Sequence, residues 1–289
     1  MASKSLIWTV LKILQKTTSY FSEHKLDNPR LNAERLLCHV LNTDRVQLYL
    51  NFDRILTKLE IDQYRTLVKR RAAQEPLQYI TGETEFMGLN FRLTRDVLIP
   101  RPETETLVER VIELSKSIYK SGSLIFDIGT GSGCIAISLA RYLINCRVMA
   151  SDISQDALYL ASENARKNQV RNLLFLQHDI LTSDPPFMQA FDIVVSNPPY
   201  VSQSEYAYLE REIKNFEPKP ALTDQADGLT FYRRILSLIG DSFKCKFLFL
   251  ELSGTQTDKI LKIARTYNFK DIKIINDLNQ IPRVLEIEV

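Results

Sequence analysis

Two consecutive prolines follow an apolar run in the segment Ser196-Asn197-Pro198-Pro199-Tyr200. Because proline has no N–H, the segment can continue neither a strand ladder nor a helix, and nearby carbonyl oxygens are left without local donors. The Asn197 side-chain oxygen and the Pro198 carbonyl can accept the two hydrogens of an amide or aromatic amine, and Tyr200 offers a face to a planar group. The lone pair of such a nitrogen is delocalised. Holding both of its hydrogens in this way would aim the lone pair at an electrophile without the help of a general base. The structural alternative is a proline turn anchored by the tyrosine.

A glycine-rich turn, Gly129-Thr130-Gly131-Ser132-Gly133, lies between a predicted strand ending near Asp127 and a predicted helix. Ligands of α/β sheets bind at the carboxyl ends of the strands, where glycines let the backbone approach them. The spacing is GxGxG and differs from the GxGxxG of dinucleotide-binding proteins. The pattern favours a cofactor loop over a simple tight turn.

Two acidic residues follow later predicted strands. Asp152 stands 23 residues after Gly129 and can accept both ribose hydroxyls of an adenosine, as in NAD or S-adenosylmethionine, or it can cap the next helix. Asp179 and Ile180 follow the third strand. The carboxylate can take an adenine amino group while the isoleucine covers the ring, although a plain loop aspartate fits equally well.

The elements that must position these residues alternate between strand and helix from Leu107 onward. This alternation predicts a doubly wound α/β sheet of seven strands. The last two strands are separated by too few residues for a crossover helix, so one of them should be antiparallel. The predicted strands are Leu124–Ile128, Val148–Asp152, Leu173–Gln177, Asp192–Ser196, Phe247–Leu252, Asp271–Ile275 and Val284–Val289, and the early helices are Ile135–Tyr142 and Asp156–Asn168.

The first 76 residues have apolar side chains at helical spacing and no predicted polar cluster of their own. Asn28 before Pro29 is typical of an N-cap followed by proline at the first helical position. Thr57 and Glu60 have capping-box spacing, and the pair Arg70-Arg71 suits a helix C-terminus. The apolar positions of the first predicted helix are Leu6, Ile7, Val10, Leu11 and Leu14.

Three domain ranges follow from these patterns. Residues 1–76 form a small helical domain, residues 77–98 a β-hairpin connector, and residues 99–289 the α/β domain. The net charge is +5 over residues 1–76 and −3 over the remainder. The basic helical part is suited to an acidic or RNA-associated partner, or it is simply a solvated surface.

The composition of the chain argues against a metal-binding, a disulfide-bonded and a membrane-spanning protein. The four cysteines are scattered without a CxxC pair and the three histidines are dispersed, so we expect neither a metal site nor disulfides. No apolar run approaches the roughly 18 residues of a membrane span, and no signal peptide is recognisable. We therefore expect a cytoplasmic protein.

The chain resembles the bacterial and organellar release-factor glutamine methyltransferases along nearly its whole length. The Asn-Pro-Pro-Tyr segment with a GxGxG loop resembles class I methyltransferases that act on planar nitrogen. The remaining matches to the family are Glu75 to Ile80, Gly82, Phe86, Gly88, Phe91, Leu98 to Glu105, Asp127 to Gly133, Asp152, Asp179-Ile180, Glu217-Pro218, Ala221-Leu222, Asp227 to Leu229, Tyr232, Leu250-Glu251 and Gln256. Ser253 and Gln280 depart from it, since the family usually has glycine there.

This resemblance implies S-adenosylmethionine as cofactor, S-adenosylhomocysteine as product, and methylation of the glutamine side-chain nitrogen in the Gly-Gly-Gln motif of release factors. It implies cofactor binding by Gly129 to Gly133, Asp152, Asp179, Ile180 and Asn197. It also implies substrate binding by Asn197 to Tyr200, with catalysis by Asn197, Pro198 and Tyr200. Residues 1–76 would recognise the protein substrate.

Three other functions remain open at this point. A glutamine methyltransferase of a ribosomal protein would share the site. An adenine-N6 methyltransferase is disfavoured because no target-recognition domain or cluster of basic and stacking aromatic residues is present, and we expect no direct nucleic-acid substrate and no membrane partner. A nicotinamide-dependent oxidoreductase is disfavoured by the glycine spacing.

Overall fold

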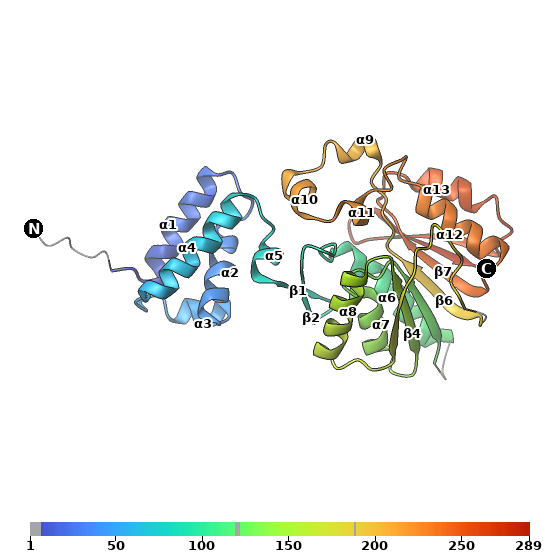
Figure 1. Cartoon of the computed structure of the whole chain (residues 1–289), viewed down its shortest axis with the longest axis horizontal. Helices are drawn as coiled ribbons and strands as arrows, with labels where there is room; N and C mark the ends of the chain where they lie inside the picture. The colour runs from blue at the N-terminus through green and yellow to red at the C-terminus, as the bar shows by residue number, and fades with distance from the viewer. Residues whose placement is uncertain (1–6, 119–121, 188) are drawn as a thin grey trace, which may run out of the picture. The chain divides into compact units, whose positions relative to one another are not determined.

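The computed structural model describes residues 7–118, 122–187 and 189–289, and within these ranges the chain forms two compact units (Figure 1). The first unit comprises the described residues up to Gly82 and, from much later in the sequence, Arg211–Phe216. The second unit comprises Glu83–Glu210 and Glu217–Val289. No helix in the described ranges has both the length and the apolar character that a bilayer span requires.

Helices build the first unit around an apolar core that includes Leu14, Phe21, Leu36 and Tyr64. The predicted capping box is confirmed, because the Thr57 side chain accepts from the Glu60 N–H while Glu60 accepts from the Thr57 N–H. The helices are α1 (Val10–Glu23), α2 (Pro29–Leu41), α3 (Arg45–Leu50), α4 (Lys58–Ala72), α5 (Leu77–Thr81) and α10 (Arg211–Phe216).

Two details at helix starts differ from the predictions. Helix α1 begins after Thr9, which caps it, so Ile7 lies before the helix and is 57% exposed, while Leu6 lies outside the described residues. Asn28 occupies the N-cap position of α2 but makes no side-chain cap bond. Its φ of 48° is left-handed, and its backbone oxygen accepts from both the backbone N–H and the side chain of Asn32.

The prediction that these helices hold no polar cluster is wrong. The Glu34 side chain in α2 is fully buried and accepts hydrogen bonds from Arg30 (2.5 Å), Arg45 (2.9 Å) and Tyr49 (2.7 Å). Arg45 and Tyr49 belong to α3, so the carboxylate ties α3 to α2. Such a buried charge is tolerated because it is paired with two arginines and accepts three hydrogen bonds.

Arg71 lies in the last turn of α4, as predicted, and it also makes buried contacts that the sequence did not predict. It is 5% exposed and donates to Asn32 Oδ1 at 2.7 Å, to the Glu75 carbonyl at 2.8 Å and to Glu212 Oε2 at 2.9 Å. Glu212 lies in α10, 141 residues away in sequence. The ion pair therefore fastens α10 to the helices of the first unit.

The second unit contains the predicted seven-stranded sheet, in the order β5-β4-β3-β6-β7-β9-β8. Strand β9 is antiparallel to both of its neighbours and the other pairs are parallel, which confirms the predicted reversal near the C-terminus. The strands are β3 (Leu124–Ile128), β4 (Arg147–Asp152), β5 (Leu173–Gln177), β6 (Phe191–Ser196), β7 (Cys245–Glu251), β8 (Asp271–Asn276) and β9 (Pro282–Glu288).

Alternate residues of the central strands pack into two separate cores, one on each face of the sheet. Ile125 and Ile193 belong to the core covered by α6, α7 and α8, whereas Phe126 and Val194 belong to the core covered by α12 and α13 (Figure 1). The helices of the second unit are α6 (Glu103–Ile118), α7 (Cys134–Tyr142), α8 (Gln155–Lys167), α9 (Gln203–Tyr206), α11 (Lys219–Leu222), α12 (Thr230–Asp241) and α13 (Thr257–Ala264).

The predicted hairpin is present but shorter than the range 77–98, because its first five residues form α5. Strands β1 (Glu83–Phe86) and β2 (Leu89–Arg92) pair in antiparallel register. The hairpin packs within the second unit, where the Arg92 N–H donates to Asn164 Oδ1 of α8 at 2.7 Å. Asn164 is fully buried and also donates to the Ser132 carbonyl at 2.9 Å, so it joins the hairpin to the glycine loop.

Candidate active site

The predicted site residues converge on one edge of the sheet. Ile128 at the end of β3 pairs with Ser151 of β4 and with Ser196 of β6, and Asp152 pairs with Gln177 of β5. The glycine loop, Asp152, Asp179-Ile180 and Asn197 therefore follow the carboxyl ends of four neighbouring strands. This is the edge at which doubly wound sheets bind ligands.

The three glycines of the loop meet different surroundings. All have positive φ angles: 74° at Gly129, 54° at Gly131 and 82° at Gly133. A Cβ added at Gly129 or Gly131 would meet nothing within 4 Å, whereas one at Gly133 would lie 2.8 Å from Ile137 and 3.0 Å from Ala161. The first two glycines thus border open space that a ligand can enter, and Gly133 lets α7 and α8 pack closely.

The side chains of Thr130 and Ser132 point into the protein and are 4% and 2% exposed. Thr130 Oγ1 donates to Asp127 Oδ2 at 2.7 Å. These two residues can offer a ligand mainly their backbone. Asp127 is fully buried, and burial raises its carboxyl pKa to about 7 despite the hydrogen bond from Thr130.

Asp152 ends β4 with both carboxylate oxygens held by backbone groups. Oδ2 accepts from Gly131 N–H at 2.8 Å and Oδ1 from Ser154 N–H at 2.9 Å. Burial raises the pKa of this carboxyl, and the backbone hydrogen bonds oppose the rise. The helix-cap alternative does not hold, because Ser154 caps α8 by accepting from Ala157 N–H. Asp152 instead orients the glycine loop and keeps lone pairs available to a ligand.

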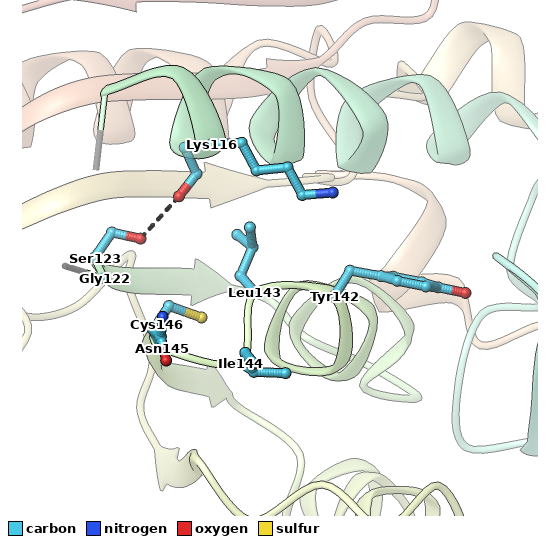
Figure 2. Close-up of a pocket in the computed structure, with 9 residues that line it drawn as sticks. Lys116, Gly122, Ser123, Tyr142, Leu143, Ile144, Asn145 and Cys146 are labelled. Atoms are coloured by element: carbon cyan, nitrogen blue, oxygen red, sulfur yellow. Dashed lines mark hydrogen bonds between the residues drawn. The ribbon is translucent and has the colours of Figure 1, made fainter. Parts of the chain in front are cut away.

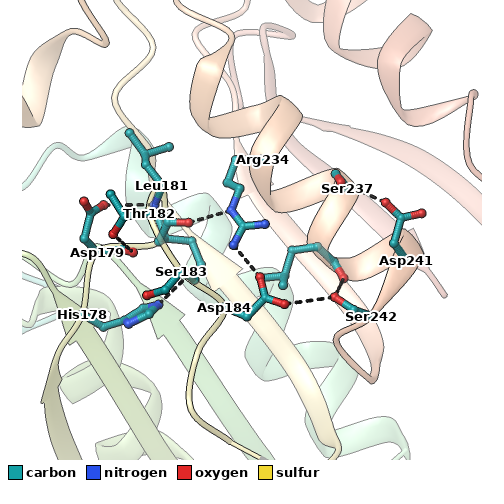
Figure 3. Close-up of polar contacts among 12 residues, drawn as sticks. His178, Asp179, Leu181, Thr182, Ser183, Asp184, Arg234, Ser237, Asp241 and Ser242 are labelled. Atoms are coloured by element: carbon teal, nitrogen blue, oxygen red, sulfur yellow. Dashed lines mark hydrogen bonds and ion pairs between the residues drawn. The ribbon is translucent and has the colours of Figure 1, made fainter.

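The segment carrying Asp179 and Ile180 is tied to α12 (Figure 3). Asp179 Oδ1 accepts from Leu181 N–H at 3.0 Å, which gives it a local turn role. Arg234 of α12 donates to the Ile180 carbonyl at 2.7 Å and to Asp184 at 2.6 Å. Ile180 is 6% exposed and belongs to the core under α12. Arg234, which the sequence did not single out, fixes this wall of the site.

The Asn-Pro-Pro-Tyr segment leaves β6 as an irregular turn. Asn197 Nδ2 donates to Thr104 Oγ1 of α6 at 3.3 Å. Across the described residues, neither Asn197 Oδ1 nor the Pro198 carbonyl accepts a hydrogen bond. Both oxygens are therefore available to the two hydrogens of a planar nitrogen. Burial raises the pKa of the Tyr200 phenol to about 12, so its ring stays neutral near pH 7.

The far end of the turn is clamped by residues from two later segments. Gln256 Nε2 donates to the Tyr200 carbonyl at 2.9 Å. Gly228 has a φ of 79°, and a Cβ there would lie 2.4 Å from the Tyr200 carbonyl oxygen. Gly228 and Gln256 match the family pattern, yet only their position in the fold reveals what they do. Thr104 and Glu251 also lie in segments that match the family, but sequence reasoning assigned neither of them a role.

A cavity of about 230 Å³ lies elsewhere, at the amino ends of β3 and β4 (Figure 2). Ser123 and Cys146, which precede these two strands, line it together with Lys116 and Tyr142. It is separated from the glycine loop by the length of the strands. It is therefore no part of the candidate active site.

Comparison with known proteins shows the family of this chain. Residues 12–82 match the family described as PrmC N-terminal domain, and residues 104–215 match the Methyltransferase small domain. The release factor glutamine methyltransferase of Geobacter sulfurreducens is 39% identical over 99% of this chain and 98% of its own length. The protein of that name from Chlorobaculum tepidum is 39% identical over 96% of this chain and 97% of its own.

Among solved structures, the catalytic domain of hMettl16 in complex with a 3'UTR hairpin aligns with a TM-score of 0.56. The alignment covers 82% of this chain and 84% of that chain at 16% identity, which shows a shared class I methyltransferase fold and nothing finer. The family matches and the two full-length relatives carry more information. They show that the chain belongs to the release factor glutamine methyltransferase family.

Proposed function

We propose that the protein methylates the side-chain amide nitrogen of the glutamine in the Gly-Gly-Gln motif of peptide-chain release factors. Family membership supports the reaction and the class of substrate. The observation that carries the proposal is the pair of unused acceptors, Asn197 Oδ1 and the Pro198 carbonyl, beside a glycine loop with open space over Gly129 and Gly131.

The residues present fit S-adenosylmethionine. The open backbone at Gly129 and Gly131 admits a ligand, and the Asp152 carboxylate lies at the adjoining strand end with lone pairs for two ribose hydroxyls. Asp179 and Ile180 would border the adenine. When bound, the cofactor supplies an electrophilic methyl group, and it leaves as S-adenosylhomocysteine.

The protein's own contribution is to present the glutamine nitrogen. Asn197 Oδ1 and the Pro198 oxygen would accept its two N–H groups, and Tyr200 would pack against the flat amide. This arrangement points the nitrogen lone pair away from both acceptors and toward the methyl group. Formation of the N–C bond would be balanced by cleavage of the methyl–sulfur bond, and one of the two held hydrogens would pass to solvent as a proton. Proximity and orientation of this kind supply several kcal/mol.

The test is the intact mass of purified release factor before and after incubation with enzyme and S-adenosylmethionine. We expect a gain of one methyl group with the wild-type enzyme, and a rate lower by about 100-fold or more with Asn197→Ala. Cofactor affinity of the variant should change far less. Wild-type turnover by Asn197→Ala would refute the mechanism, and methylation of a ribosomal protein in place of release factor would refute the substrate.

We further propose that the helical residues 1–76 recognise the release factor. A groove of about 340 Å³ lies between α1 and α4. Its apolar floor includes Trp8 and Val68, and its exposed rim carries Lys16, Arg65 and Lys69. A single glutamine side chain buries far less than the roughly 800 Å² per partner of an ordinary protein interface, so a second surface is needed. The three cations make an acidic face of the release factor the matching partner.

A further inference from the structure

A buried carboxyl group lies at the end of the strand next to the one that Asn197 follows. Glu251 is the last residue of β7 and is 3% exposed. Ser196 of β6 pairs in parallel register with Leu250 of β7, so Asn197 and Glu251 come next on two adjacent strand ends. A carboxyl group in the interior is costly unless its surroundings use it.

Thr104 connects this carboxyl group to Asn197. It lies in the first turn of α6 and is 2% exposed. Thr104 Oγ1 accepts from Asn197 Nδ2 at 3.3 Å, and the same side chain interacts with the Glu251 carboxyl group, which lowers the pKa of that group. Within the ranges that the structure describes, Glu251 Oε2 has no partner. Asn197, Thr104 and Glu251 therefore form a series of interacting polar side chains that is shielded from water.

The direction of these hydrogen bonds decides which way the Asn197 amide faces. Its oxygen and nitrogen ends have nearly the same shape, so packing alone cannot distinguish them. An ionised carboxylate only accepts, and a hydroxyl has one hydrogen to give. Once Thr104 has donated that hydrogen to Glu251, it presents lone pairs to Asn197, which suit the NH₂ end. The amide oxygen is then turned away from Thr104.

We propose, on the basis of the role of Asn197 in the proposed function, that Thr104 and Glu251 are positioning residues that keep the Asn197 oxygen available to the substrate amide. Neither touches the reacting atoms. A flipped Asn197 would place its NH₂ group against the N–H groups of the glutamine, which would repel the substrate nitrogen from its reactive orientation. Loss of the series should therefore lower kcat while leaving cofactor affinity intact.

The protonation of Glu251 adds a second observable. Burial raises its pKa to about 7, the hydrogen bond from Thr104 and the nearby Arg283 and Arg101 oppose the rise, and Glu103 adds to it. Tyr200 and Tyr232 also face the group and stay neutral in this range. A protonated Glu251 can donate to Thr104, which frees the threonine hydrogen to point at Asn197. The kcat should therefore fall as the pH falls through about 7.

The experiment compares Thr104→Val, which is nearly isosteric but has no hydroxyl, with Thr104→Ser, which keeps it. We expect Thr104→Val to lower kcat by roughly tenfold, the rate equivalent of one lost hydrogen bond, and Thr104→Ser to stay close to wild type. Calorimetry should show unchanged affinity for S-adenosylmethionine. Ser138→Ala is the control, because its buried hydroxyl has no hydrogen-bond partner among the described residues.

Glu251→Gln keeps the shape of the side chain and cannot titrate. Its kcat should therefore not show the fall at low pH that we expect of the wild type around the Glu251 pKa of about 7. Full kcat in Thr104→Val, with Asn197→Ala impaired, would overturn this positioning role and leave the proposed function standing. An equal loss of kcat in the Val and Ser variants, or lost cofactor affinity, would show a merely structural threonine. Normal turnover by Asn197→Ala would instead refute the proposed function itself.

Discussion

Gly228 illustrates how tightly the turn after β6 is held. A Cβ at this position would lie 2.4 Å from the Tyr200 carbonyl oxygen and 2.7 Å from Gln256 Nε2, at a φ of 79° that side chains rarely adopt. Gly228→Ala should therefore displace Tyr200 and break the Gln256 bond. We expect kcat to fall by roughly 10- to 100-fold, since small displacements of a positioned group cost that much.

The matched control for that substitution is Gly88→Ala in the β1–β2 turn. Its φ of 67° imposes the same backbone strain, but the nearest atom to an added Cβ is the Tyr142 hydroxyl at an ordinary 3.7 Å. Steady-state kinetics should show near-normal kcat for this variant, with both proteins losing some stability. Equal kcat losses in the two variants would attribute the effect to strain and remove Gly228 from the site.

Asp152 tests the cofactor assignment at the same scale. Asp152→Ala removes the carboxylate that holds Gly131 and that would bind the ribose hydroxyls. Each charge-assisted hydrogen bond is worth about 1.5–3 kcal/mol, so affinity for S-adenosylmethionine should fall at least about tenfold. Calorimetry measures this directly. Asp156→Ala, which removes an exposed charge in the first turn of α8, is the control, and similar affinities for the two variants would refute the assignment.

At the scale of elements, α2 and α3 depend on the buried Glu34. Burial raises its carboxyl pKa, but hydrogen bonds from Tyr49, Arg30 and Arg45 outweigh this, so the pKa lies below its ordinary 4.5. The stabilisation is therefore fully present above about pH 4.5 and is lost as the pH falls through the lower folded-state value. Glu34→Gln removes the negative charge that the two arginines share and places an NH₂ donor against one set of donors, and it should cost about 2–4 kcal/mol at pH 7.

Urea unfolding monitored by circular dichroism checks this expectation. The difference between wild type and Glu34→Gln should be large at pH 7 and should shrink below pH 4.5, where the wild-type carboxylate becomes protonated. Asp62→Asn is the comparison, because it disrupts only an exposed pair with Arg65 at 3.7 Å, worth under about 1 kcal/mol. A constant difference across the whole pH range would show that the charge of Glu34 does not matter.

At the scale of the whole molecule, recognition and chemistry are assigned to different units. Replacing Lys16 and Lys69 by glutamate reverses two charges on the rim of the α1–α4 groove. If an acidic face of release factor docks there, KM for release factor should rise at least tenfold and its salt dependence should weaken, while cofactor affinity stays the same. Point changes suit this unit better than truncation at residue 76, because α10 is part of it.

The control for charge reversal is Lys262→Glu, which makes the same change on exposed α13 of the second unit. Initial rates against release-factor concentration, at low and at physiological salt, distinguish the two surfaces. An unchanged KM in the groove variant would remove the groove from substrate recognition. A comparable rise in the Lys262 variant would indicate a general effect of net charge.

Much of this protein follows from its sequence alone, because local patterns determine it. The periodicity of apolar residues predicted the strands of the sheet. The short segment between the last two strands predicted that one strand near the C-terminus is antiparallel. The Asn-Pro-Pro-Tyr and GxGxG segments predicted the chemistry, since prolines and glycines constrain the backbone wherever they occur. Gly129, Asp152 and Asn197 were each predicted to follow a strand, and parallel strands share one carboxyl edge.

Only the tertiary structure decided which groups support those residues. Thr104 and Glu251 are separated from Asn197 by 93 and 54 positions, and Gln256 is separated from Tyr200 by 56. Arg71 meets Glu212 across 141 positions, and this contact places α10 in the helical unit. Side-chain contacts over such separations depend on how helices pack on the sheet. Hydrophobic periodicity specifies which face of an element is buried, but it does not specify which polar partner that face will meet.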